Sequence, residues 1–271
     1  MVDMAVITKI TTQKNNKERF NVFINRGAGE EYGFSVDQDV LISSRLKKGM
    51  EIDMGALEKI LAEDRVKKAY NLALSYLSYR MRSEKEVVDY LKKKEYEEWE
   101  IHQVIGKLKE YNFLNDQDFA VAFVRTKKNT GVKGPKVIEQ ELFKKGVNEK
   151  MAAVALDEYT YAEQLEHIIK WVEKQAKKTL KESQQAYQQR IKRQLLSKGF
   201  SYEVIEEGLK ENGVSFNTDQ QWEAIVHQGE KGKRKFSHLS NYEYRYKLKQ
   251  WLYQKGFPID LIERYLEDNR E

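Results

Sequence analysis

Apolar residues recur at helical spacing over most of the chain, from residue 65 onward. Around one reference leucine, another apolar residue lies four positions earlier, and further apolar residues lie nine or ten and fourteen positions later. Four segments share this pattern, and their reference leucines are Leu91, Leu142, Leu195 and Leu252. Because residues four apart lie on one helix face, the pattern predicts amphipathic helices. Its return every 51 to 57 residues predicts a tandem array of helical repeats.

A turn signal follows each reference leucine. The third residue after it is always lysine: Lys94, Lys145, Lys198 and Lys255. The fourth is glycine in three segments: Gly146, Gly199 and Gly256. A cation in the last turn and a glycine just beyond it are typical of a helix C-terminus. The first segment has Glu95 in place of the glycine, so we expect its turn to differ.

Each segment also contains an earlier amphipathic stretch, which predicts a third helix. These stretches begin at residues 69, 119, 165 and 222. Capping boxes support helix starts at Ser83, which precedes Glu86 by three residues, and at Thr218, which precedes Gln221 by three. We therefore expect four three-helix repeats. Their boundaries are residues 65–114, 115–160, 161–214 and 215–271.

Residues 1–64 follow a different pattern. Residues 5–12, 19–25 and 32–36 alternate apolar and polar side chains, as half-buried strands do. Residues 50–52 are expected to be extended again, whereas residues 37–44 and 57–64 read as helices. The predicted fold class is mainly α: a tandem array of three-helix repeats with a small N-terminal β-containing module.

The amino-acid composition excludes several kinds of site and indicates the cellular compartment. The chain has only 2 prolines and no cysteine, which excludes disulfides, thiolate metal sites and cysteine catalysis. No apolar run approaches the roughly 20 residues that a membrane span needs. Residues 1–12 lack a basic stretch followed by an apolar core, so no secretory signal is expected. We therefore expect a cytoplasmic protein with no membrane contact, and a monomer.

Positive charge is concentrated in the helical part. Residues 1–64 carry a net charge of −2, and residues 65–271 carry +7. Basic residues gather between the first and second helix of each repeat, and the candidate binding residues are Arg80, Arg82, Arg125, Lys127, Lys128, Lys133, Lys136, Lys177, Lys178, Lys181, Lys233, Arg234 and Lys235. Cations spaced along one side of an array can match a phosphate backbone or an acidic filament groove. Lysines also solubilise exposed turns. If the cations bind a partner, charge reversal at Lys127, Lys128 and Lys133 should weaken binding without unfolding the protein.

Residues 69–160 resemble the RecX family. In the first repeat the matching residues are Ala69, Ala73, Leu74, Leu77, Arg80, Arg82, Ser83 and Glu86. In the second repeat they are Leu114, Asn115, Asp116, Phe119, Ala120, Phe123, Val124, Gly134, Pro135, Ile138, Glu141, Leu142, Lys145, Gly146 and Val147. The last two repeats match by pattern more than by identity. The β module and the fourth repeat look like the longer form found in Gram-positive bacteria.

The resemblance implies a function that spacing alone does not. RecX proteins are regulators of the RecA recombinase. The resemblance implies binding to RecA and to its filaments on single-stranded DNA, altered filament growth, and so an effect on strand exchange, homologous recombination, DNA repair and the SOS response. It implies an array of three-helix units, possible direct DNA contact, no cofactor and no catalytic residue.

Other functions carry weaker signals. A general nucleic-acid-binding helical array without a RecA partner would use the same cations with Tyr76, Trp171, Trp222 and Trp251. Residues 131–135 are glycine-rich and basic but lack the Gly-Lys-Ser/Thr ending of a phosphate loop. Glu223, His227 and His238 are too scattered to predict a metal site. A metal-dependent nuclease is therefore the weakest hypothesis, and we predict no metal site and no enzyme activity.

Overall fold

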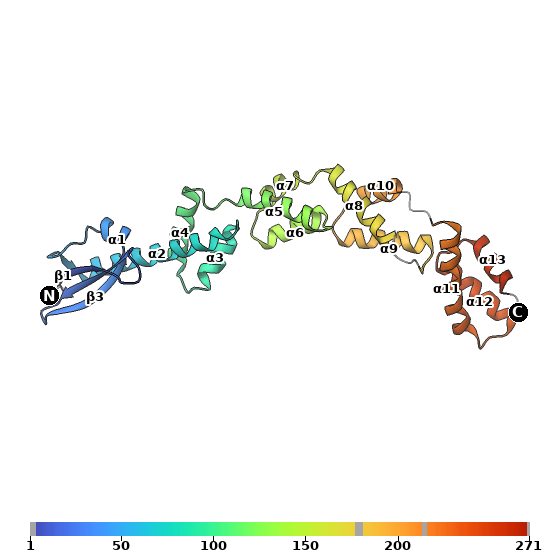
Figure 1. The fold of residues 1–271 in the computed structure, drawn as a ribbon, viewed down its shortest axis with the longest axis horizontal. Coiled ribbons are helices and arrows are strands. Elements are labelled where there is room, and N and C mark those ends of the chain that lie inside the picture. The colour runs from blue at the N-terminus through green and yellow to red at the C-terminus, as the bar shows by residue number, and fades with distance from the viewer. Residues whose placement is uncertain (1–3, 177–180, 213–215, 270–271) are drawn as a thin grey trace. The chain divides into compact units, whose positions relative to one another are not determined.

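The computed structural model describes residues 4–176, 181–212 and 216–269 (Figure 1). The chain divides into two units. One contains residues 1–119 and 145–147, and the other contains residues 120–144 and 148–271. Each unit is described by itself.

The N-terminal module is an antiparallel four-stranded sheet with one short helix. Its strands are β1 (Met4–Thr12), β2 (Arg19–Asn25), β3 (Glu30–Asp37) and β4 (Glu51–Asp53), in the order β3-β2-β1-β4. Helix α1 (Gln38–Ser43) follows β3. Alternate strand residues such as Ile7, Val22, Ile24 and Val36 are fully or almost fully buried. The alternating pattern therefore marks the face that forms the core of the module, and the predicted β-containing module is confirmed.

Helix α2 (Met54–Ser78) joins the sheet to the first repeat. Its Ile60 packs in the core of the β module, whereas Val66, Ala69 and Ala73 pack in the core of the first repeat. The helix expected over residues 57–64 and the helix expected from residue 69 are one continuous helix, so the expected boundary between residues 64 and 65 falls inside it. No glycine or proline interrupts residues 56–78, and nothing in the backbone stops the helix there.

Three helices form each repeat, as predicted. In the described residues they are α2, α3 (Glu84–Lys92) and α4 (Glu98–Glu110); α5 (Asp116–Thr130), α6 (Pro135–Lys144) and α7 (Glu149–Leu156); α8 (Tyr161–Ala176), α9 (Gln184–Ser197) and α10 (Tyr202–Asn212); and α11 (Thr218–Phe236), α12 (Asn241–Gln254) and α13 (Ile259–Asp268). All four reference leucines are fully buried. The mainly α fold with tandem three-helix repeats is thus confirmed.

The turn after each second helix has a residue with positive φ at the same position in all four repeats. The glycines have φ values of 85° at Gly146, 90° at Gly199 and 82° at Gly256, and Glu95 has 62°. The expectation that the first turn differs is therefore wrong. Arg65 holds this turn, since its guanidinium donates to the Glu95 carbonyl oxygen at 3.3 Å and to the Glu100 carboxylate at 3.1 Å. The left-handed conformation costs a non-glycine residue roughly 1–2 kcal/mol.

Glycine at position 95 should therefore stabilise the first repeat. We expect Glu95→Gly to raise the free energy of unfolding by about 1 kcal/mol, because it removes this strain and keeps the carbonyl that Arg65 contacts. Urea denaturation of the purified variant measures the change. Lys93→Gly is the matched control, since Lys93 has right-handed helical geometry with φ of −64° and should lose stability. A loss of stability in Glu95→Gly would contradict the argument.

Candidate partner-binding surface

In the first repeat, the two predicted arginines are held by other side chains. Arg80 pairs with Glu86 at 2.8 Å, and Lys145 reaches the same carboxylate at 2.6 Å. Burial opposes ionisation of Glu86, but the hydrogen bonds from Arg80 and Lys145 outweigh it and lower the pKa of Glu86 to about 2. Arg82 lies 3.5 Å above the centre of the Tyr76 ring and donates to the Tyr76 carbonyl oxygen. Both arginines thus fasten the segment between α2 and α3.

In the second repeat, three more predicted cations are paired with carboxylates. Lys127 and Lys133 share Glu141, with Lys127 at 3.3 Å. Burial raises the pKa of Glu141, but the hydrogen bonds from these lysines hold it below its ordinary value. Arg125 pairs with Glu158 at 2.9 Å. Two carboxylates therefore neutralise two of these three positive charges within the repeat.

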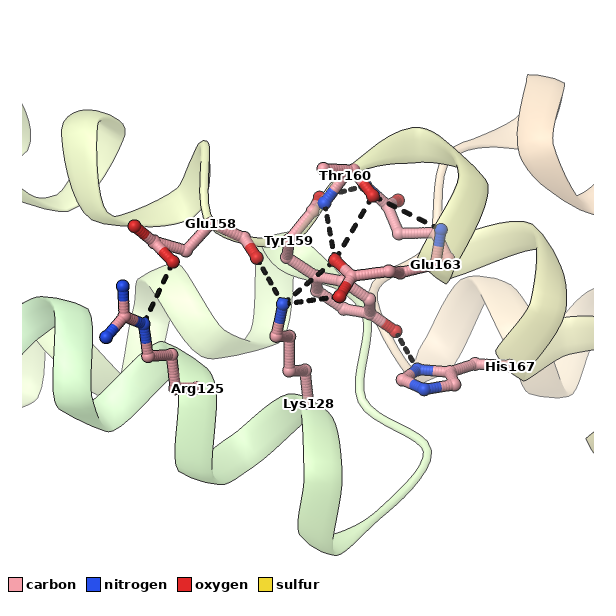
Figure 2. A network of polar contacts seen from close by, with 8 residues as sticks. Arg125, Lys128, Glu158, Tyr159, Thr160, Glu163 and His167 are labelled. Atoms are coloured by element: carbon pink, nitrogen blue, oxygen red, sulfur yellow. Dashed lines mark hydrogen bonds and ion pairs between the residues drawn. The ribbon is translucent and has the colours of Figure 1, made fainter.

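Lys128 is the centre of the network in Figure 2. Its ammonium donates to the Glu158 carbonyl oxygen and to both carboxylate oxygens of Glu163, the latter at 2.7 and 2.9 Å. Glu163 also accepts from the Thr160 amide at 3.0 Å. The Lys128 side chain is only 11% exposed. The network therefore joins the end of α5 to the start of α8.

A pair of aromatic side chains, the buried Tyr159 and the half-buried His167, lies beside this network. The Tyr159 hydroxyl and His167 Nδ1 are 2.7 Å apart. Figure 2 marks this contact between the two side chains. Tyr159 is 2% exposed, and burial raises the pKa of its hydroxyl well above the ordinary value. The Lys128 ammonium lies 5.9 Å from the centre of the Tyr159 ring. These contacts make the joint between the second and third repeats a packed structural feature.

Alanine at position 128 should loosen this joint. We expect Lys128→Ala to lower the free energy of unfolding by about 1–2 kcal/mol, because it removes the ammonium that donates to both Glu163 carboxylate oxygens and to the Glu158 carbonyl. Differential scanning calorimetry measures the loss. Arg125→Ala is the control, since its ion pair with Glu158 is exposed and should contribute little. Equal losses in both variants would show that Lys128 has no special role.

These ion pairs also change the meaning of the charge-reversal experiment. An acidic residue at 127, 128 or 133 would face Glu141 or Glu163. Like charges at that distance repel, and a partly buried pair would be lost. Reversal there would therefore alter stability together with any partner binding.

The remaining predicted cations lie in more open surroundings. Lys136, Lys181 and Arg234 are exposed, and none has a carboxylate within 4.0 Å in the part of the chain that the structure describes. Lys233 instead pairs with Glu230 at 3.0 Å, and the Lys235 ammonium lies 4.3 Å from the Trp251 ring centre. The predictions at Lys177 and Lys178 lie outside the described residues.

Two neighbouring residues on α11, one lysine and one histidine, were not among the predicted binding residues. Lys231 is exposed and His227 is half-buried. Burial first, and then the charges of Lys231 and Lys181, lower the pKa of His227. In the sequence, Lys231 is part of the basic run 231–235. Only the structure shows that it lies on the same face of α11 as His227, near the segment that contains Lys181. Over residues 4–176, 181–212 and 216–269, no group of three or more His, Asp or Glu side chains could hold a metal ion.

Backbone amides of the glycine-rich segment before α6 and of the start of α6 donate hydrogen bonds to carbonyl oxygens of the third repeat. The Gly134 amide donates to the Lys198 carbonyl oxygen at 2.8 Å, and the Lys136 amide donates to the Gly199 carbonyl oxygen at 3.2 Å. These amides are therefore used in packing between repeats. Within the described helices, none has the length and apolar character needed to cross a bilayer.

Family models match the chain in order from end to end. The model "Regulatory protein RecX N-terminal domain" matches residues 5–53. The first and second three-helix domains of RecX match residues 69–108 and 115–156. The third three-helix domain of RecX matches twice, at residues 162–209 and 219–266. The last two repeats are thus two copies of one type.

Similar proteins cover almost the whole chain. "Regulatory protein RecX" of Halalkalibacterium halodurans is 47% identical over 98% of this chain and 100% of its own length. That of a Geobacillus species is 46% identical over 99% and 98%.

Two crystal structures are also similar. A regulatory protein RecX is 34% identical, with a TM-score of 0.68 over 76% of this chain and 99% of its own. RecX from Lactobacillus salivarius is 41% identical, with a TM-score of 0.53 over 55% and 97%. With the repeats and the N-terminal sheet in the same order as the matching models, the chain belongs to the RecX family.

Proposed function

We propose that this protein regulates the RecA recombinase by binding RecA and its filaments on single-stranded DNA. Binding there would modulate filament growth, strand exchange and the SOS response. The single observation that carries the proposal is the match to RecX models in all parts of the chain, with full-length relatives named regulatory proteins. The described cations that lack an acidic partner support an anionic binding partner.

The proposed role is that of a binding protein. It needs no cofactor, and we infer no catalytic step, because regulation of a filament requires only differential affinity for its assembled and unassembled forms. We further infer that the protein acts as a monomer in the cytoplasm. The four repeats with their boundaries at 65–114, 115–160, 161–214 and 215–271 would act as successive contact units on the filament.

RecA activity on single-stranded DNA tests the proposal. RecA ATPase and strand-exchange rates should change when this protein is added at substoichiometric levels in low salt. An unchanged rate under those conditions would sink the proposal. A matched reaction with the same protein after heat denaturation controls for added protein.

A general nucleic-acid-binding role is the second candidate. It is favoured by the basic helical part and by cations that have no acidic partner among the described residues. The two roles differ in relative affinity. Binding to naked DNA as tight as binding to the RecA–DNA filament favours the general role, whereas preferential binding to the filament favours regulation of RecA.

A further inference from the structure

The two C-terminal repeats share a run of basic positions. Residues 162–209 and 219–266 match the same family model, 57 positions apart. At that spacing, five basic residues of the third repeat have a basic residue or histidine as counterpart. The pairs are Lys170 and His227, Lys174 and Lys231, Lys177 and Arg234, Lys178 and Lys235, and Lys181 and His238. Lys177 and Lys178 lie outside the described residues and are not used below.

The first two repeats lack this run. Equivalent positions in the first helices of the first three repeats are marked by two buried residues that lie four positions apart. The earlier of the two is Ala69 in α2, Ala120 in α5 and Ile168 in α8. The residues two and six positions after this buried residue are both lysines in α8. They are Asn71 and Ser75 in α2, and Ala122 and Thr126 in α5. The basic run is therefore a property of the third type of repeat.

Three residues of α11 in the fourth repeat and Lys181 of the third repeat form one surface, here named the α11 strip: Lys181, His227, Lys231 and Arg234. The last three lie at positions i, i+4 and i+7 of α11, which places them on one helix face over roughly 10 Å. The Gln228 side chain donates to the Lys181 carbonyl oxygen at 2.6 Å, so the segment before α9 lies against the same helix.

The opposite face of α11 is held close to the rest of the repeat. A Cβ atom at Gly229 would lie 2.2 Å from the Tyr265 ring, and one at Gly232 would lie 2.4 Å from Leu248. Glycine inside a helix costs roughly 0.5–1 kcal/mol relative to alanine. The close approach of α12 and α13 to these glycines fixes which face of α11 points outward.

Positive charge on the α11 strip is not neutralised by the described part of the protein. None of its four residues has a carboxylate within 4.0 Å there, in contrast to Lys127, Lys128 and Lys133 of the second repeat. No large apolar side chain of α11 is among the exposed ones. An interface with a protein buries an apolar centre, whereas a phosphate backbone needs only cations and donors.

We propose that the α11 strip binds the sugar–phosphate backbone of nucleic acid. This inference rests on the proposed function and places direct nucleic-acid contact on α11 and the segment before α9, where the third and fourth repeats meet. Lys181 and Lys231 supply point charges, and the Arg234 guanidinium offers paired donors to phosphate oxygens. Because the strip has no exposed aromatic residue to stack on bases, binding is independent of sequence and depends steeply on salt.

A charge-removal variant tests the strip in the full-length protein. The variant carries Lys181→Gln, Lys231→Gln and Arg234→Gln, and the probe is a fluorescein-labelled oligothymidylate followed by anisotropy over a salt series. We expect at least a tenfold loss of affinity at low salt. The slope of log affinity against log salt should become shallower by about 2, since each contact to single strands contributes about 0.7.

The control variant removes the same charge elsewhere. Lys92→Gln, Lys109→Gln and Lys249→Gln delete three partly exposed lysines that pair with Glu98, Glu84 and Glu263. Its affinity should change by less than about twofold, because these charges are already compensated. Circular dichroism checks that both variants are folded. Lys231→Arg, which keeps the charge, should retain wild-type affinity.

The outcomes separate this inference from the proposed function. Equal losses of affinity in both triple variants, or no binding of the wild type to the oligonucleotide, would overturn the proposed role of the strip. Neither result would contradict an effect on RecA. A strip variant that loses its effect on RecA but keeps oligonucleotide affinity would also overturn it, in favour of an acidic protein surface. Selective loss of oligonucleotide binding supports the strip even where the wild type proves not to affect RecA.

Discussion

Replacing Asp64 with alanine is expected to release the N-terminal sheet from α2, at a cost of about 3–5 kcal/mol. Asp64 lies on α2 with a side chain only 2% exposed. Its carboxylate accepts two hydrogen bonds from Arg19 on β2, at 3.2 and 3.0 Å, and one from the Asp37 amide at 2.7 Å. Lys68 pairs with it at 2.8 Å. Removing the carboxylate leaves the Arg19 guanidinium, 14% exposed, without its main partner.

The ionised form of Asp64 carries this stabilisation. Burial opposes its charge, but the hydrogen bonds from Arg19, Lys68 and the Asp37 amide outweigh burial and lower the pKa of Asp64. A carboxyl whose pKa is lower in the folded state stabilises the fold above its unfolded pKa of about 3.9. The contribution is therefore complete at neutral pH and is lost as pH falls below that value.

Hydrogen exchange of the β1, β2 and β3 amides measures the effect at neutral pH. In Asp64→Ala these amides should lose protection, while the α11 and α12 amides should keep theirs. Asp39→Ala is the matched control, because its carboxylate is 69% exposed and, among the described residues, forms an ion pair with Lys67 alone. We expect that control to cost well under about 1 kcal/mol. Unchanged protection of the sheet in Asp64→Ala would refute the role assigned to it.

A methyl group at Gly134 should break the contact between the second and third repeats. A Cβ atom there would lie 2.3 Å from the Gly199 carbonyl carbon and the Phe200 amide nitrogen. Backbone cannot move aside as a flexible side chain can, and two hydrogen bonds between these turns would be lost as well. We expect Gly134→Ala to cost about 3 kcal/mol, at the upper end of overpacking effects.

Gly131 offers a control in the same loop. A Cβ atom at Gly131 meets nothing within 4 Å, so Gly131→Ala should leave stability nearly unchanged. Urea denaturation combined with hydrogen exchange of residues 134–137 compares the two variants. If both variants unfold at the same urea concentration as the wild type, the repeats do not depend on this backbone contact.

The same joint recurs along the array. In each case the turn after a second helix packs on the start of the preceding repeat's second helix. A Cβ atom at Gly199 would lie 2.5 Å from the Val137 amide nitrogen, one at Gly256 would lie 2.9 Å from Ser183, and one at Gly146 would lie 2.7 Å from Lys85. These glycines therefore serve two needs, a left-handed backbone and space for a neighbour.

Glu95 shows why the first repeat departs from the glycine pattern. No repeat precedes it, and Glu95 is exposed, so its turn needs the left-handed backbone but not the empty space. A different turn was expected at Glu95 because the sequence does not show whether a glycine is needed for its left-handed backbone or for the space that it leaves to a neighbour. The turn is also contacted by Arg65, a residue 30 positions earlier in the sequence.

Local physical chemistry made most of the fold readable from the sequence. The spacing of buried leucines, the lysine and glycine at helix ends, the capping boxes and the strand alternation each act over a few residues, and they predicted most elements. The box expected at Thr218 and Gln221 is wrong by one residue, because Asn217 and Gln220 form it. The family resemblance likewise rested on short strings such as Gly134-Pro135 and Lys145-Gly146.

Tertiary structure alone decided which cations remain available. The basic run 125–136 looked uncompensated in sequence, because its acidic partners come from elsewhere: Glu163 lies 35 residues from Lys128, and Glu158 lies 33 from Arg125. The reverse holds for the α11 strip, where folding leaves nearby cations without carboxylates in the described residues. Helical periodicity is a local property that sequence encodes directly, whereas charge compensation depends on which distant segments packing brings together.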